Sequence, residues 1–213
     1  MNMIASVLHL DRGAMQALRV TDPYSLHRVV YGLYADVRSE TDKTAGRSSG
    51  ILYADRGGDI HGRRILLLAD RAPSDCAEGG HGRVDSRPVP EGFLAHDRYR
   101  FTIIVNPVRR ENASGKIVPI KGREAVVAWF AECAPRWGFD VSSAPLQIDR
   151  INVQHFTDKA LRPVTLAQAH VAGLLRVTDR AQFRASFTHG IGRGRSFGCG
   201  LLQIVPLVDP VSA

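Results

Sequence analysis

The sequence predicts an α+β fold made of two tandem ferredoxin-like (RRM-like) domains with antiparallel sheets. Its second half has the pattern strand, helix, strand, strand, helix, strand, which is the order of a split β-α-β unit. Its first half begins strand, helix, strand, strand, so we expect a degenerate copy of the same unit. A chain of 213 residues, 44% of them hydrophobic, can form two small domains. We expect the boundary near residue 95, with domains over residues 1–95 and 96–213.

The predicted elements of the first half are a strand over residues 3–10, a helix over 21–38, and strands over 48–55 and 63–70. Asp22 is a favourable N-cap for the helix, and Pro23 is a favourable first helical residue. An apolar stripe at helical spacing is expected to face the core, and it consists of Leu26, Val29, Val30, Leu33, Tyr34 and Val37. Paired glycines predict a turn between the two strands at Gly57-Gly58. Residues 71–91, rich in Gly, Pro and charge, are expected to be irregular.

The predicted elements of the second half are strands over residues 96–110, 117–120, 146–157, 164–178 and 200–208, and helices over 122–138 and 179–190. Gly138 is expected to end the first of these helices, and Asp179 stands near the start of the second. The two strands between the helices alternate like a pair.

The chain is basic, with 28 Lys and Arg against 21 Asp and Glu and a formal net charge of +7. This balance favours a polyanionic partner such as nucleic acid or an anionic membrane surface. The three cysteines, Cys76, Cys133 and Cys199, are odd in number and far apart, which argues against a disulfide framework and a zinc site. The N-terminal residues do not resemble a signal peptide, and no apolar run is long enough to span a membrane. We therefore expect a cytoplasmic protein without a membrane partner.

The motif "THGIGRGRSFGCGLLQIVPL", residues 188–207, has five glycines between Gly190 and Gly200. A dinucleotide-binding loop needs a strand before it and a helix after it, whereas here a helix precedes and a strand follows. We therefore expect no cofactor. Two interpretations remain: a tight connection with positive φ angles, and a backbone surface for a phosphate chain. The basic composition favours the second, and the residues expected to contact the phosphate chain there are Gly192, Arg193, Gly194 and Arg195.

Near the N-terminus, "DPYSLHR" places Tyr24, His27 and Arg28 at positions i, i+3 and i+4 of the predicted helix. All three lie outside the apolar stripe. Imidazole titrates near neutral pH, so a tyrosine and a histidine at this spacing can move protons. The alternative is a surface histidine with no role.

Two predicted hairpins are basic. The first and its exit carry Arg109, Arg110, Lys116, Lys121 and Arg123, and the second carries Lys159 and Arg162. Either these residues bind the backbone of duplex RNA, or they are ordinary surface charges on solvated hairpins. No His-x-x-x-His motif, cysteine pair or carboxylate pair has metal-ligand spacing, so we expect no metal. Cleavage of RNA without metal is feasible because the substrate supplies a 2′-hydroxyl nucleophile.

Together these segments resemble the CRISPR-associated CasE endoribonucleases, the repeat-RNA-processing subunits of Cascade. The resemblance covers most of the chain and rests on "DPYSLHRVVY", "YRFTIIVNPVRR" with "GKIVPIKG", "AVVAWFAECAPRWGF" and the terminal glycine motif. It implies two ferredoxin-like domains and metal-independent cleavage at the base of a repeat hairpin, leaving a 2′,3′-cyclic phosphate and a 5′-hydroxyl. It also implies that the enzyme keeps its product and joins the other Cascade subunits.

The catalytic Tyr-x-x-His motif of close relatives matches Tyr24 and His27, and Arg28 matches a basic position beside the histidine. Some relatives have a lysine five residues after the histidine, where this chain has Gly32. The leading hypothesis is thus a repeat-RNA endoribonuclease in which His27 acts as base or acid, Tyr24 contacts the phosphate and Arg28 stabilises charge. A catalytically inactive scaffold subunit that binds repeat RNA is the alternative, and a small-molecule enzyme using the glycine loop is the third.

Overall fold

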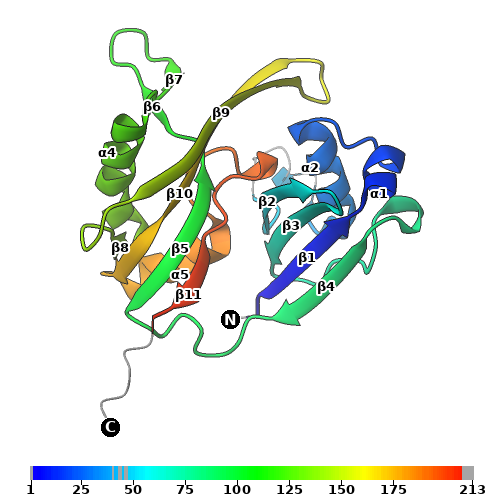
Figure 1. Ribbon diagram of the computed structural model, residues 1–213, viewed down its shortest axis with the longest axis horizontal. Helices are drawn as coiled ribbons and strands as arrows, with labels where there is room; N and C mark the ends of the chain where they lie inside the picture. Colours follow the sequence, from blue (N-terminus) through cyan, green and yellow to red (C-terminus); the bar gives the residue numbers. More distant parts are fainter. Residues whose placement is uncertain (1, 40, 43–44, 46–47, 208–213) are drawn as a thin grey trace.

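The computed structural model describes residues 2–39, 41–42, 45 and 48–207, and its strands form two main antiparallel sheets (Figure 1). The first sheet has the order β2-β3-β1-β4. Its strands are β1 (Ile4–Leu10), β2 (Ile51–Asp59), β3 (Gly62–Ala69) and β4 (Arg83–Pro88). This order, with a long helix between β1 and β2, is that of a ferredoxin-like unit. Between β3 and β4 the second helix of such a unit is replaced by irregular chain and the single turn η1 (Glu78–Gly80), so the copy is degenerate as predicted.

Helix α2 (Pro23–Gly32) begins where the sequence predicts but ends earlier than expected. The Asp22 carboxylate accepts from the Ser25 backbone nitrogen at 2.7 Å, which confirms the N-cap. Leu26 and Val30 are buried beneath the helix. Because the helix ends at Gly32, Val37 falls outside it and is 66% exposed, so its place in the apolar stripe was wrong. A shorter helix, α1 (Arg12–Ala17), was not predicted.

Two further predictions in the first half were wrong. Gly57 and Gly58 lie inside β2, where the pairing with β3 shifts register between Asp55 and Gly58, and the turn follows the strand at residues 60–61. The two consecutive glycines therefore lie at a β-bulge in β2 and not in the hairpin turn. Residues 71–91 are not wholly irregular, because β4 pairs with β1 along its length. As an edge strand β4 buries only Val84, so it lacks the apolar pattern that identifies a strand.

The second sheet has the order β11-β5-β10-β8, with β9 also paired to β10. Its strands are β5 (Arg98–Val105), β8 (Phe139–Asp140), β9 (Gln147–Thr157), β10 (Pro163–Val177) and β11 (Gln203–Pro206). A separate two-stranded hairpin consists of β6 (Val108–Arg110) and β7 (Ile117–Pro119). The long strand predicted over 96–110 is divided at Asn106-Pro107, since proline has no N–H to donate to a sheet.

The helices of the second half are α4 (Arg123–Cys133), extended by the 3₁₀ turn η2 (Ala134–Trp137), and α5 (Arg180–His189). Gly138, at φ +85°, ends the first as predicted. The Asp179 carboxylate accepts from the Gln182 backbone nitrogen at 3.0 Å and caps the second. The α+β fold with two ferredoxin-like units and antiparallel sheets is therefore confirmed. No helix among the described residues is long and apolar enough to cross a membrane.

The two sheets pack against each other through a continuous apolar core. Residues alternate along β2: Ile51 and Tyr53 face the core under α2, whereas Leu52 and Ala54 join the core of the second half. The first sheet thus has α2 on one face and the second half of the chain against the other.

Candidate active site

The catalytic residue predicted from the sequence, His27, lies where α2 meets the C-terminal glycine loop. Burial of Leu26 and Val30 leaves His27 on another side of α2. That side contacts η3 (Arg195–Phe197), a single turn inside the glycine motif. The Nδ1 atom of His27 lies 2.8 Å from the carbonyl oxygen of Ser196. A carbonyl can only accept, so Nδ1 carries the proton and donates it.

Aromatic rings surround the imidazole of His27. The ring centroid of Tyr31 lies 4.0 Å from that of His27, and those of Phe197 and Tyr24 lie 5.7 Å and 6.1 Å away. Tyr24 and Tyr31 come from the helical turns on either side of His27, and Phe197 comes from η3. The imidazole therefore has aromatic neighbours from both α2 and η3.

Burial among these groups lowers the pKa of His27 below its usual 6.5. The hydrogen bond to Ser196 opposes this shift, because it favours the protonated ring, and the positive charge of Arg38 adds to it. His27 is consequently neutral at neutral pH. With Nδ1 protonated, Nε2 keeps its lone pair, and it has no hydrogen-bond partner among the described residues. A neutral imidazole held in this way can accept a proton.

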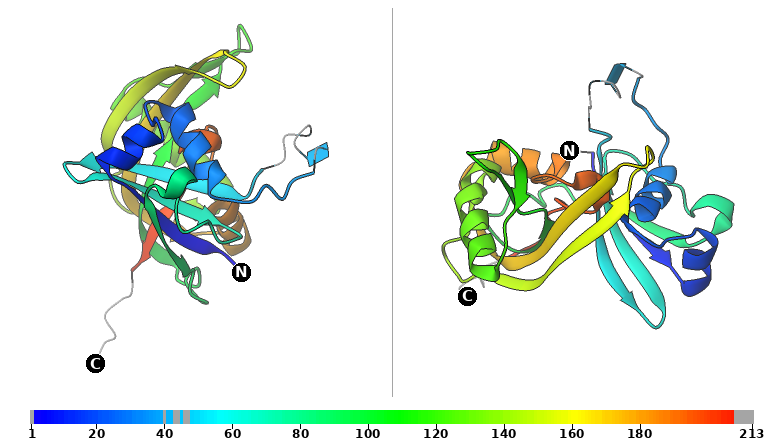
Figure 2. Two further views of the ribbon diagram at one scale, coloured as in Figure 1. Left: turned by 90° about the vertical axis from the view of Figure 1, so that its right-hand side faces the viewer. Right: turned by 90° about the horizontal axis from the view of Figure 1, so that it is seen from above.

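A cleft of about 840 Å³ opens beside His27. Tyr24 and Arg28, the other two predicted catalytic residues, line it together with His27. The charged side chains on its wall are Arg19, Arg28, Lys159 and Glu78. Three cations against one carboxylate make the cleft suited to a polyanion. Lys159 comes from the β9–β10 hairpin, whose tip passes over α2 in the right-hand view of Figure 2, so both halves of the chain build the cleft.

A family model described as CRISPR associated protein matches residues 3–206. The chain belongs to this family of CRISPR-associated proteins. Membership confirms the resemblance drawn from the sequence motifs.

Among the relatives is the CRISPR-associated endoribonuclease Cse3 of Thermus thermophilus. It is 29% identical over 198 residues, which cover 88% of this chain and 92% of Cse3. The structure of a CRISPR endoribonuclease Cse3 bound to a 19-nucleotide RNA matches with a TM-score of 0.80 and 23% identity, covering 96% of this chain and 99% of that one. A chain of a CRISPR RNA-guided surveillance complex in a pre-nicking state matches with a TM-score of 0.67 and 22% identity, covering 96% and 100% of the two chains. These structural likenesses confirm the fold of this CRISPR-associated protein.

The basic residues predicted on the two hairpins occupy different surroundings. Both hairpins project from the upper side of the molecule in Figure 1. Arg109 and Lys116 are exposed on the β6–β7 hairpin, and the Arg110 guanidinium donates to the Gly115 carbonyl at 2.7 Å. On the other hairpin, Arg162 forms an ion pair with Asp158 at 2.7 Å, whereas Lys159 enters the His27 cleft. Of these hairpin residues, the structure thus brings only Lys159 into the cleft lined by the predicted catalytic residues.

The glycine loop has a structural explanation that the sequence left open. Gly194 and Gly198, at φ +79° and +82°, bracket η3, and a Cβ at Gly198 would lie 3.1 Å from the ring of Tyr53. Arg195 donates to the His189 carbonyl at 2.7 Å, so its guanidinium closes the loop on itself. Arg193 and Gly192 are exposed, with open space around Gly192. The glycines let the loop approach itself and the first sheet, and contact with RNA through this loop stays a prediction.

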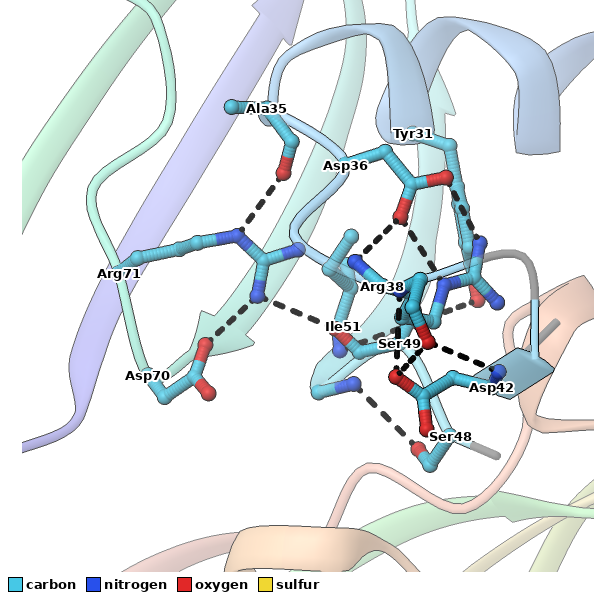
Figure 3. Close-up of polar contacts among 12 residues, drawn as sticks. Tyr31, Ala35, Asp36, Arg38, Asp42, Ser48, Ser49, Ile51, Asp70 and Arg71 are labelled. Carbon is cyan, nitrogen blue, oxygen red and sulfur yellow. Dashed lines mark hydrogen bonds and ion pairs between the residues drawn. The ribbon is translucent and has the colours of Figure 1, made fainter.

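Several residues around His27 were not predicted from the sequence. Tyr31 was detectable, since it lies four positions after His27 on the same helix. Its hydroxyl accepts from the Ser49 hydroxyl at 3.1 Å, and Arg38 lies beside it, held by Asp36 with Nε and Oδ1 3.1 Å apart (Figure 3). Tyr53 and Ser196 were not detectable, because no pattern links strand β2 to a loop more than 140 residues later.

Proposed function

We propose that this chain is a metal-independent endoribonuclease that cleaves the hairpin of a CRISPR repeat RNA to give mature guide RNA and stays bound as a subunit of Cascade. The setting of His27 supports this chemistry. The imidazole is neutral, its Nδ1 donates a hydrogen bond to the Ser196 carbonyl, and its ring lines a cationic cleft. Family membership and the names of the similar proteins support the substrate and the assembly.

In the proposed reaction His27 is the general base. Its Nε2 takes the proton of the 2′-hydroxyl beside the scissile phosphate, and the 2′-oxygen attacks phosphorus. The bond from phosphorus to the 5′-oxygen breaks, which leaves a 2′,3′-cyclic phosphate and, once the 5′-oxygen takes up a proton, a 5′-hydroxyl. Tyr24 hydrogen-bonds the phosphate. Arg28 and Lys159 stabilise the charge that develops on the phosphate oxygens in the transition state.

The cations of the cleft favour the enzyme over an inactive scaffold. The scaffold alternative arose because Gly32 stands where some relatives have a lysine. Gly32 is exposed on the wall of the same cleft, and nothing lies within 4 Å of a Cβ built there. Lys159 reaches that cleft from the other half of the chain. We infer that Lys159 and Arg28 supply the positive charge that Gly32 does not.

The remaining site residues are proposed to bind RNA backbone outside the cleft. They are Arg109, Arg110, Lys116, Arg162, Gly192, Arg193, Gly194 and Arg195. The division of the chain near residue 95 and a cytoplasmic location belong to the same proposal. The strands of the two sheets end and begin on either side of that position, at Pro88 and Arg98.

Cleavage of a labelled repeat hairpin RNA in excess EDTA tests the function. The substrate comes from the CRISPR array beside the gene. Wild type is compared with His27→Ala, and an RNA with a 2′-deoxy substitution at the scissile nucleotide is the substrate control. We expect cleavage by wild type alone and none of the deoxy substrate. Tight binding without cleavage by wild type would favour the scaffold, and equal cleavage by the His27→Ala variant would refute the role of His27.

A further inference from the structure

The carbonyl oxygen of Ser196 receives two hydrogen bonds from different elements. His27 on α2 donates from Nδ1 at 2.8 Å, and Tyr53 on β2 donates from its hydroxyl at 3.0 Å. A carbonyl oxygen has two lone pairs, so these two donors saturate it. The oxygen that orients His27 is thus itself oriented by Tyr53.

Tyr53 is rigidly held. Its side chain is 1% exposed and packs in the core beneath α2, while its ring fits against Gly198 at the end of η3. The alternation of β2 directs Tyr53 toward α2, since its neighbours Leu52 and Ala54 face the opposite side. The hydroxyl therefore reaches Ser196 from a fixed position in the sheet.

The tautomer of a neutral histidine is set by the hydrogen bond that one ring nitrogen makes. Free imidazole side chains in water favour the proton on Nε2, the nitrogen that the proposed base must keep unprotonated. The bond to Ser196 reverses that preference only while the carbonyl stays aimed at Nδ1. This carbonyl belongs to η3, a single 3₁₀ turn between two left-handed glycines, and the Tyr53 hydroxyl is the donor that ties it to the first sheet.

We propose that Tyr53 is a positioning residue for His27: its hydroxyl fixes the Ser196 carbonyl, and that carbonyl holds His27 in the tautomer with the proton on Nδ1. The inference rests on the proposed function in that His27 is taken as the group that moves the proton. It adds that the competent state of His27 requires the glycine loop to be docked against β2. The first sheet and the C-terminal loop together set the protonation pattern of one side chain.

The test compares Tyr53→Phe with a matched variant, Tyr34→Phe. Tyr34 is buried in the same core, and its hydroxyl has no hydrogen-bond partner among the described residues. Each variant removes one buried hydroxyl, but only Tyr53→Phe affects Ser196. Long-range ¹H–¹⁵N spectra of ¹⁵N-labelled protein, at a pH above the pKa of His27, report the tautomer. The His27→Ala spectrum assigns the signals. Single-turnover cleavage and RNA affinity are measured in parallel.

We expect wild type and Tyr34→Phe to carry the proton on Nδ1, and Tyr53→Phe to shift toward the Nε2 tautomer. The cleavage rate of Tyr53→Phe should fall on the order of tenfold, as for the loss of one neutral hydrogen bond, with RNA affinity unchanged. A proton on Nε2 in wild type would overturn the proposal. So would an unchanged tautomer in Tyr53→Phe, whatever its activity, because a merely structural role moves stability and not the tautomer. If wild type cleaves no RNA, the proposed function fails, and the tautomer still decides this inference.

Discussion

The rings of His27 and Tyr31 lie 4.0 Å apart, one helical turn from each other on α2. This contact covers one side of the imidazole and contributes to the burial that lowers its pKa. The Tyr31 hydroxyl accepts from Ser49, which ties the ring to the chain that leads into β2. The aromatic contact and the hydrogen bond of His27 thus come from different parts of the fold.

Removing the ring of Tyr31 should raise the pKa of His27 toward 6.5, because burial is the largest cause of its depression. An NMR titration of the His27 ring protons in Tyr31→Ala measures the shift. Tyr31→Phe keeps the ring and loses only the hydroxyl, so its His27 pKa should match wild type. Equal pKa values in wild type and Tyr31→Ala would show that Tyr31 does not bury the imidazole.

The cleavage rate should depend on pH with the sign expected for a base of lowered pKa. His27 in its neutral form accepts the proton, so the single-turnover rate should rise with pH up to the pKa of His27, which burial holds below 6.5, and level off above that pKa. If protonated His27 acted instead as an acid in the slow step, the rate would fall over the same range. A pH series with chemistry rate-limiting, checked by its independence of enzyme concentration, separates the two.

Lys159→Ala should slow the chemical step more than it weakens RNA binding. Lys159 lines the cleft with His27, and loss of a cation near the reacting phosphate should cost about tenfold or more in rate. Arg136→Ala is the control, since it removes an exposed cation that pairs with Glu132 on α4, away from the cleft. Equal single-turnover rates for Lys159→Ala and wild type at saturating protein would refute the role of Lys159.

Gly32→Lys should be accepted by the fold and should not slow cleavage. A Cβ at Gly32 meets nothing within 4 Å, and replacing an exposed helical glycine stabilises a helix by about 0.5–1 kcal/mol. Urea denaturation measures the stability, and Gly32→Ala separates the gain in helix propensity from the effect of charge. Because Arg28 and Lys159 already supply positive charge to the cleft, Gly32→Lys should cleave at least as fast as Gly32→Ala; slower cleavage by Gly32→Lys would contradict this prediction.

Gly198→Ala should destabilise the protein more than Gly192→Ala. Both glycines are left-handed, at φ +82° and +69°, and an alanine at either should cost roughly 1 kcal/mol. Only at Gly198 would the new Cβ press on another residue, 3.1 Å from Cε2 of Tyr53, which should add about 1 kcal/mol or more. Comparable free energies of unfolding for the two variants would mean that the loop yields without disturbing Tyr53.

Local signals in the sequence determined most of the helices and strands. Asp22 and Asp179 mark helix starts and Gly138 marks a helix end because caps act over three or four residues. The Tyr24–His27 spacing predicted the candidate catalytic helix because residues three positions apart are neighbours on a helix surface. Edge strand β4 was missed because an exposed strand needs no apolar pattern, and its partner β1 lies far away in the sequence.

Only the tertiary structure decided how His27 is held. Its hydrogen-bond acceptor, Ser196, its aromatic neighbour Phe197 and the cleft residue Lys159 all come from the other half of the chain. The glycine motif indicated that the backbone approaches something closely, but not that it approaches Tyr53 and α2. Contacts of this kind depend on how the two sheets pack through their apolar faces. Hydrophobic periodicity predicts that a strand has an apolar face, but not which other element that face packs against.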